Sequence, residues 1–402
     1  MDVFSIICHQ LKWLKKLKWR HWVLIALLLI ILFIKSSVYW SLEYTFRFYP
    51  YIGWMLSHIS GIFPFAIGDL FIALSISWVI LYPVYQICIK KKLIKKGWLR
   101  QDATLLKKRM VFCHVAEYLL WVYAWFYLAW GLNYSQPIIF MRMRMMPAKV
   151  SKQTLRDFAN RYVDSINYLS ESISYKDLKK RTQDEVLHGY NQLPLRMGIN
   201  SPFNQHPRVK TMVFTPLSSM AGVTGSMGPF FCEFTLNGDI LPHDYPATYA
   251  HEFAHFLGVA NEGEANFYSY IVCTASADKQ VRFSGYYHIF FHVLNNVFDI
   301  LGEKEGERFL RHIRPEIIQL AKSDRRYWLS KRCKALDAAQ DFIFELYLRG
   351  NHVAEGRKSY SGVIGLILAW EEKKNNDSCH FRQELFTTRA IYDKWPHKTQ
   401  RG

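Results

Sequence analysis

The stretch HEFAH, from His251 to His255, carries two histidines and a glutamate at a spacing that suits metal-assisted hydrolysis. Residues four apart lie on one face of an α-helix, so both imidazoles can bind the same ion. Glu252 lies beside them, where its carboxylate can hold and deprotonate a water polarised by that ion. The stretch therefore predicts a Zn²⁺ site with His251 and His255 as ligands and Glu252 as the general base.

A catalytic zinc site needs a third protein ligand and one open position, and the candidates lie just downstream in NEGEAN. Asn261 is a suitable N-cap for a helix that begins at Glu262. Glu262 and Asn266 would then share a face, with Glu262 on the metal and Asn266 accepting the second ring N–H of a ligand histidine. Glu264 would point about 200° away around that helix. Glu262 is the preferred third ligand, and Glu264 is the alternative.

Two resemblances follow from these residues. The ExxA(D/N) pattern after HExxH resembles that of gluzincin peptidases, which implies that Glu262 is the third ligand and that Asn266 supports a ligand histidine. The whole chain resembles an uncharacterised family of bacterial membrane proteins with three N-terminal spans. The segments that carry this resemblance are WGLNY at Trp130–Tyr134, G-x-T-G at Gly222–Gly225, and HExAHxxGxxxExEAN. It implies zinc-dependent proteolysis.

Three apolar segments, at about residues 22–40, 70–89 and 110–132, are long enough to cross roughly 30 Å of hydrocarbon as helices. No small-residue cleavage site follows the first segment, so a retained anchor is favoured over a signal peptide. The intervening residues 41–69 are apolar but interrupted by Gly and Pro, and they are expected to lie along the membrane surface. His114 and Glu117, near the start of the third span, are interpreted as interfacial. Residues 1–134 are therefore predicted to form a membrane region with three transmembrane helices.

The chain has a formal charge of +18, and its positive charge is concentrated next to the apolar segments. Residues 1–134 contain 16 Lys/Arg against 5 Asp/Glu, and nine of these basic residues lie between Lys90 and Arg109. Basic loops stay in the cytoplasm, which places the N-terminus inside and everything after the third span outside. The same distribution favours membrane topology over nucleic-acid binding. The predicted location is the cell membrane, with residues 135–402 extracytoplasmic.

Residues 135–402 are predicted to form an α+β, mainly helical, zincin-like domain. The histidine helix should begin near Asp244 or Tyr245, with Pro246 in its first turn, and end at Gly258. Two strands are expected, at Val209–Pro216 and Pro229–Leu236, and the second is the candidate edge strand for binding an extended substrate. Helical spacing of apolar residues further predicts helices at Ser151–Leu178, Ala265–Ala277, Tyr286–Leu301, Lys304–Ala321, Lys334–Leu348 and Ser359–Trp370.

Hydrolysis also needs a donor that stabilises the oxyanion of the transition state. Tyr286, Tyr287 and His288 in GYYHIF, and Tyr360 in RKSYSG, are the candidates, although core packing is the alternative role for each. The seven cysteines show no CxxC and no regular spacing, so we expect free thiols, with one or two disulfides among Cys232, Cys273, Cys333 and Cys379 as the alternative.

The hypothesis from the sequence is a membrane-anchored zinc metallopeptidase that hydrolyses a peptide or protein substrate at the outer face of the bilayer. Two alternatives stay open. One is a non-catalytic scaffold or sensor in which the metal is structural, and the other is a zinc hydrolase of a non-peptide cell-envelope substrate.

Overall fold

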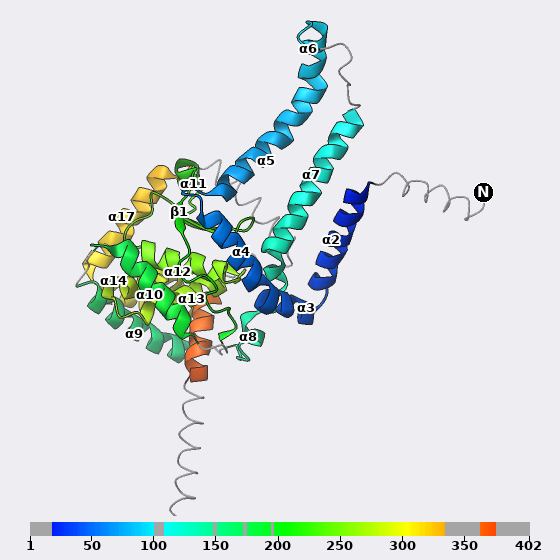
Figure 1. Ribbon diagram of the computed structural model, residues 1–402. Coiled ribbons are helices and arrows are strands. Elements are labelled where there is room, and N and C mark those ends of the chain that lie inside the picture. The colour runs from blue at the N-terminus through cyan, green and yellow to red at the C-terminus, as the bar shows by residue number, and fades with distance from the viewer. Residues whose placement is uncertain are drawn as a thin grey trace, which may run out of the picture.

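The computed structural model describes residues 18–99, 108–147, 151–171, 175–193, 197–333 and 362–374. Long apolar helices extend from one side of a mainly helical body that contains a small sheet (Figure 1). The predicted helix at Lys334–Leu348, Tyr360, Cys8 and Cys379 lie outside the described residues. Cys232, Cys273 and Cys333 are free thiols.

Two helical stretches are long and apolar enough to cross a membrane: Ile67–Lys95, which comprises α5 (Ile67–Val84), η2 (Tyr85–Ile89) and α6 (Lys90–Lys95), and α7 (Lys108–Ala129). The basic end of the first, α6, is the end far from the body (Figure 1). Helix α2 (Trp19–Lys35) is long and apolar enough to cross a membrane only when it is counted together with Val38–Gly61, and the two are bent by 103° relative to each other. The described chain therefore has two or three candidate spans.

The first predicted span, 22–40, is not one straight helix. Helix α2 ends at Lys35, and α3 (Val38–Glu43) begins after Ser37, whose hydroxyl accepts the N–H of Trp40. This N-cap satisfies a donor of the new helix and thereby stabilises the break. After η1 (Tyr44–Phe48), α4 (Tyr49–Gly61) packs against the body instead of lying only along a membrane surface.

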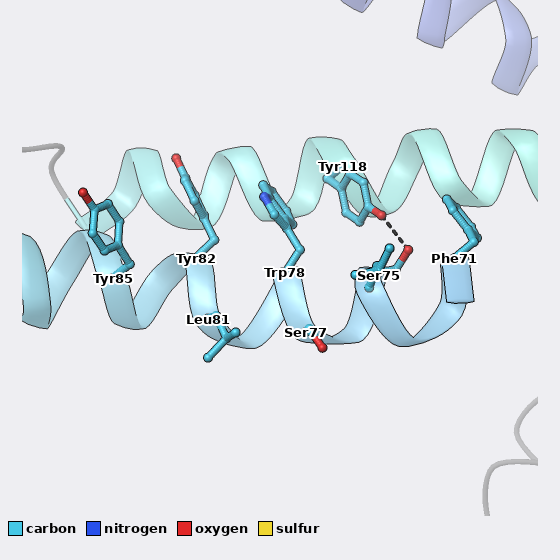
Figure 2. A pocket seen from close by; sticks show the side chains of 9 residues that line it. Phe71, Ser75, Ser77, Trp78, Leu81, Tyr82, Tyr85 and Tyr118 are labelled. Carbon is cyan, nitrogen blue, oxygen red and sulfur yellow. Dashed lines mark hydrogen bonds between the residues drawn. The ribbon is translucent and has the colours of Figure 1, made fainter. Parts of the chain in front are cut away.

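Helices α5 and α7 contact each other through aromatic side chains (Figure 2). Trp78 packs on Tyr118 with 4.5 Å between ring centroids, and the Tyr118 hydroxyl is 2.7 Å from that of Ser75. The two polar residues near the start of α7 also have partners, since His114 hydrogen-bonds to the Tyr82 hydroxyl and Glu117 pairs with Arg20 of α2. Internal pairing of this kind lowers the cost of placing polar groups in a span. A shallow groove of about 800 Å³ lies along this pair, with Phe71, Trp78, Tyr82 and Tyr85 in its wall.

The sheet has three short strands in the order β1 (Val209–Thr211), β3 (Glu233–Leu236), β2 (Gly225–Gly228). Strand β3 pairs parallel with β1 and antiparallel with β2. The prediction of Pro229–Leu236 as an edge strand is therefore wrong: Pro229–Cys232 is the turn of the β2–β3 hairpin, and β3 is central. The edge strand beside it is β2. Its two glycines have a low β-propensity, so the sequence pattern did not predict a strand there.

The body consists of helices packed around the sheet and around α12 (Tyr245–Phe256) and α13 (Glu262–Thr274). The helix predicted for 151–178 ends at Leu169, the one predicted for 286–301 is interrupted at Ile289, and the one predicted for 304–321 is interrupted before Pro315, where proline favours a new N-terminus. The remaining helices of the described chain are η3 (Gly131–Ser135), α8 (Ile139–Arg142), α9 (Lys152–Leu169), α10 (Leu178–Gln192), α11 (Thr215–Met220), α14 (Lys279–His288), α15 (Phe290–Asn296), η5 (Val297–Leu301), α16 (Glu303–His312), α17 (Pro315–Lys331) and the helix at 362–374.

Glu233, the first residue of β3, joins the sheet to the start of α5. Its carboxylate accepts the N–H groups of Ile67 and Gly68, at 2.9 and 2.5 Å, and pairs with Lys210 of β1 at 2.5 Å. Both charged side chains are only 1% exposed. The first N–H groups of a helix have no partner within it, so a carboxylate at that place satisfies them and interacts well with the helix dipole. A Cβ at Gly68 would lie 2.8 Å from the Glu233 carboxylate, so glycine permits this approach.

We expect Glu233→Gln to destabilise the protein by roughly 3 to 5 kcal/mol, because it leaves Lys210 as an unpaired buried charge. The measurement is the thermal unfolding midpoint of the full-length protein in detergent. Glu307→Gln is the matched control, since it breaks the exposed Glu307–Arg311 pair, and such pairs contribute at most about 1 kcal/mol. Equal midpoints for the two variants would contradict a structural role of the buried pair.

Candidate metal centre

The two predicted ligand histidines and Glu262 come together where α12 ends and α13 begins. His251 Nε2 lies 3.0 Å from His255 Nε2 and 3.1 Å from a carboxylate oxygen of Glu262, and that oxygen is 3.5 Å from His255 Nε2. Gly258, at φ +95°, allows the chain to turn after α12. The Asn261 side chain then caps α13 by accepting the N–H of Glu264. These three side chains form a group that could hold a metal ion.

Each histidine is oriented through its other ring nitrogen. His251 Nδ1 donates to the Asn266 side-chain oxygen at 2.7 Å, and His255 Nδ1 donates to the Val259 carbonyl at 2.6 Å. With the Nδ1 atoms protonated, both Nε2 lone pairs face the carboxylate of Glu262. Ligand atoms about 2.0 to 2.1 Å from a tetrahedral Zn²⁺ lie roughly 3.3 Å from one another. The observed separations and the N, N, O donor set fit such an ion.

The charges of the cluster support the same interpretation. Burial by itself would lower the pKa of His255, but the adjacent Glu262 carboxylate raises it to about 9. Burial would raise the pKa of Glu262, yet the two imidazoles hold it well below its ordinary value. The three groups thus bring together two basic nitrogens and a carboxylate that stays ionised. A metal ion would replace the protons held here, so we expect its binding to be weaker in acid.

Glu252 lies between the metal ligands and the edge of the sheet. Its side chain is buried, burial raises the pKa of its carboxyl, and the N–H of Met227 in β2 donates a hydrogen bond to it. A Cβ at Gly225 would lie 2.6 Å from both Cγ and Oε1 of Glu252, so only glycine allows the strand to come this close. Gly225 is the last residue of the G-x-T-G segment, but the spacing of that segment alone does not reveal the contact between Gly225 and Glu252.

The carboxyl end of α12 is held by side chains from outside the helix. The Trp130 indole donates to the carbonyl of His255 at 3.0 Å, and the Tyr49 hydroxyl donates to the carbonyl of Phe256 at 2.7 Å. Trp130 follows α7, and Tyr49 begins α4. Two further carbonyls, those of Leu257 and Gly258, accept from Asn200 and Gln136. Sequence reasoning missed these residues as site components. Trp130 was visible only as part of the WGLNY segment.

Glu264, the alternative third ligand, is placed elsewhere. Its carboxylate pairs with Arg142 and accepts the N–H of Ile139 at 3.0 Å, and both charged side chains are buried. This pair joins α13 to the segment that follows α7. The geometry therefore places Glu262 in the group that could hold a metal ion and Glu264 in a buried ion pair away from that group.

In the described chain, the predicted oxyanion donors Tyr286 and Tyr287 contact residues other than the candidate metal ligands. Tyr286 packs on Tyr162 and Tyr270, with ring centroids 5.6 Å away in both cases. Tyr287 donates its hydroxyl to Asp324, and its ring packs edge-on to His243.

His288 is the predicted donor closest to the centre, because its Nε2 donates to Asn266 at 2.9 Å. Burial and the nearby His251 lower its pKa to about 3, so the ring is neutral. It supports the residue that orients His251, which is a different role from the one predicted. Tyr360 lies outside the described residues.

A second group of metal-binding residue types, His243, Asp244 and Asp324, joins the start of α12 to α17. His243 Nε2 is 2.7 Å from Asp324, and burial raises the pKa of Asp244 to about 6. His243, the Tyr287 hydroxyl and Asp324 satisfy one another, and we assign this group a structural role.

We expect Glu262→Gln to reduce bound zinc from about one ion per chain to near zero, because it removes the only anionic ligand of the cluster. The measurement is metal content after purification of the full-length protein and dialysis. Glu264→Gln is the matched control and should keep its zinc while lowering the unfolding midpoint. The reverse pattern would make Glu264 the ligand.

We expect Tyr49→Phe to weaken zinc binding severalfold, because it leaves the Phe256 carbonyl beside His255 without its donor. The measurement is competition for zinc against a chromogenic chelator. Tyr44→Phe is the matched control, since it removes a similar bond, from the Tyr44 hydroxyl to the carbonyl of Leu128, which does not involve α12. Equal zinc affinities in both variants would show that the end of α12 does not need this support.

Residues 44–368 match a family described as protein of unknown function (DUF3810). No curated protein matches the chain, and no solved structure does. The matched range contains α4, α5, α7, the sheet and every residue of the candidate centre. The chain therefore belongs to the DUF3810 family.

Proposed function

We propose that this protein is a membrane-anchored, zinc-dependent metallopeptidase. The observation that carries the proposal is the convergence of three ligand atoms within 3.5 Å, beside a buried glutamate at the edge of a sheet. The Glu262 side chain is 32% exposed, so the centre lies near the protein surface. A structural zinc site is closed by four protein ligands, whereas a catalytic site keeps one position open. Three ligands near the surface favour catalysis over a structural metal.

In the proposed reaction, His251, His255 and Glu262 hold the zinc ion, which would acidify a water and polarise the scissile carbonyl. Glu252 accepts the proton of the attacking water and passes it to the leaving amine. A raised pKa suits this role, because a base must also release its proton within the same cycle. Asn266 keeps the lone pair of His251 directed at the metal.

An extended substrate would lie along β2. Among the described strands, β2 is the edge beside α12, and Glu252 contacts it at Gly225 and Met227. An exposed strand edge can pair with an added peptide through main-chain hydrogen bonds. Binding there would bring a peptide carbonyl next to Glu252, which favours a peptide or protein substrate over a non-peptide bond.

The proposed location is the cell membrane, with the N-terminus in the cytoplasm and the metal centre outside. The basic residues of α6 lie at the far end of α5 from the body (Figure 1), so the positive-inside rule separates them from the centre by the thickness of a bilayer. The proposed partners are accordingly a polypeptide substrate and the lipid bilayer, and the positive charge needs no nucleic acid to explain it.

We expect Glu252→Gln to lower peptide cleavage at least a hundredfold while zinc stays near one ion per chain, because only proton transfer is lost. The assay is cleavage of a degenerate peptide mixture by the full-length protein, read by mass spectrometry, with a chelator as a second way of stopping turnover. Glu307→Gln, on the exposed face of α16, should cleave as the wild type does.

Full activity of Glu252→Gln would exclude this glutamate as the base. A wild-type protein that holds zinc but cleaves no peptide would favour one of the two alternatives, a structural metal or a non-peptide substrate.

A further inference from the structure

We propose that the substrates are polypeptides anchored in the membrane, and that they are cut within about six residues of its outer surface. This inference rests on the proposed function and adds the substrate class. It follows from the direction of the edge strand, from the residues at the tip of its hairpin, and from the apolar surface around them.

The edge strand β2 leads from the catalytic glutamate toward the membrane helices. It begins at Gly225, where an added Cβ would lie 2.6 Å from the Glu252 side chain, and it ends at Gly228. The next residues form the hairpin turn Pro229–Cys232. A chain paired with β2 therefore has one end at the metal centre and the other end at this turn.

The turn lies against the body-side ends of α5 and α7. The Phe230 ring is 4.9 Å from that of Phe71 in α5, and the Phe230 carbonyl accepts the indole N–H of Trp125 in α7 at 2.9 Å. Phe231 also packs on Phe71, with 5.6 Å between ring centroids. Phe71 is in the second turn of α5, and Trp125 is in the last turns of α7. The hairpin tip thus lies beside the body-side ends of the two candidate spans, where we infer that they leave the bilayer.

The strand geometry sets how far the metal centre is from that level. An extended chain advances about 3.3 Å per residue, so the five steps from Gly225 to Phe230 cover at most about 17 Å. A substrate strand along β2 would span the same distance with five or six residues. A peptide bond beside Glu252 is therefore close in sequence to the point where the substrate meets the membrane.

The surface around the hairpin tip is apolar and suits contact with lipid. The loop before α5 exposes Ile62, Phe63 and Phe65, which are 73%, 38% and 43% exposed. The start of α11 adjoins α5 as well, because the Val213 N–H donates to Asp69 at 2.9 Å, and Leu217 on α11 is 54% exposed. A cluster of exposed apolar side chains marks a surface that contacts a membrane or another molecule. Because this surface is continuous with the base of a candidate span, the outer leaflet is the occupant we assign to it.

The test uses the full-length protein in liposomes and peptides of 25 degenerate residues that carry a lipid anchor at one end. Anchors at the amino end and at the carboxyl end are compared, and mass spectrometry gives the position of each cut. We expect the cuts to cluster within about six residues of the anchor. The same peptides with a 20-residue polar spacer next to the anchor should be cut at least tenfold more slowly in the degenerate part.

A matched pair of variants tests the hairpin. Phe230→Ser removes the ring packed on α5 and should spread the cuts along the peptide. Phe291→Ser, on a half-exposed ring of α15, should leave the distribution unchanged. Cuts spread evenly by the wild type, or no effect of the spacer, would overturn the inference while leaving the peptidase intact.

A second readout does not require turnover. The Glu252→Gln variant is photo-crosslinked to an anchored peptide that carries a benzophenone six residues from the lipid, and the attached residues are mapped. Attachment to β2 supports the binding of anchored chains along this strand even if the wild type cuts no peptide, in which case the cleavage fails and the binding site stands. Attachment elsewhere, or the same yield with an unanchored peptide, overturns the inference.

Discussion

The carboxyl end of α12 is the constraint on which the metal centre depends. The last carbonyls of a helix have no partners within it, and here that end carries His255. Trp130 and Tyr49 supply donors to the two carbonyls nearest this histidine, and both are buried. They belong to the segments that lead out of α7 and into α4. The position of His255 is therefore tied to the part of the chain that adjoins the candidate membrane helices.

The sheet also connects the candidate metal centre to α5 and α7. Glu233 binds the start of α5, Phe230 packs on α5 and accepts from α7, and the strand between Gly225 and Gly228 leads back to Glu252. Glu252 and His255 thus each connect to a candidate membrane helix through one or two side chains. These contacts support the interpretation that the apolar helices and the candidate metal centre form one unit.

The centre itself was largely predictable because its signals are local. His251 and His255 are one helical turn apart, Asn261 starts the next helix, and Glu262 and Asn266 share a face of it. Short-range periodicity and capping preferences are sufficient to bring these side chains together. The choice between Glu262 and Glu264 needed the tertiary structure, because it depends on Arg142, a residue distant in sequence that pairs with Glu264. The donor role of the tyrosines stays a prediction for a related reason: their spacing in the sequence does not say which neighbours take up their hydroxyls, as Asp324 does for Tyr287.

By itself, the sequence determined the apolar helices, the asymmetry of positive charge and the pairing of His251 with His255 in a group that could hold a metal ion, since each depends on residue type and on contacts within a few residues. Only the tertiary structure decided which strand is the edge, because β2 is short and rich in glycine and becomes a strand by pairing with β3. It also decided that Gly225 makes room for Glu252 and that Trp130 and Tyr49 hold the end of α12. These contacts join segments that lie far apart in the chain, and no local pattern of residues encodes which distant partner will fill a given space.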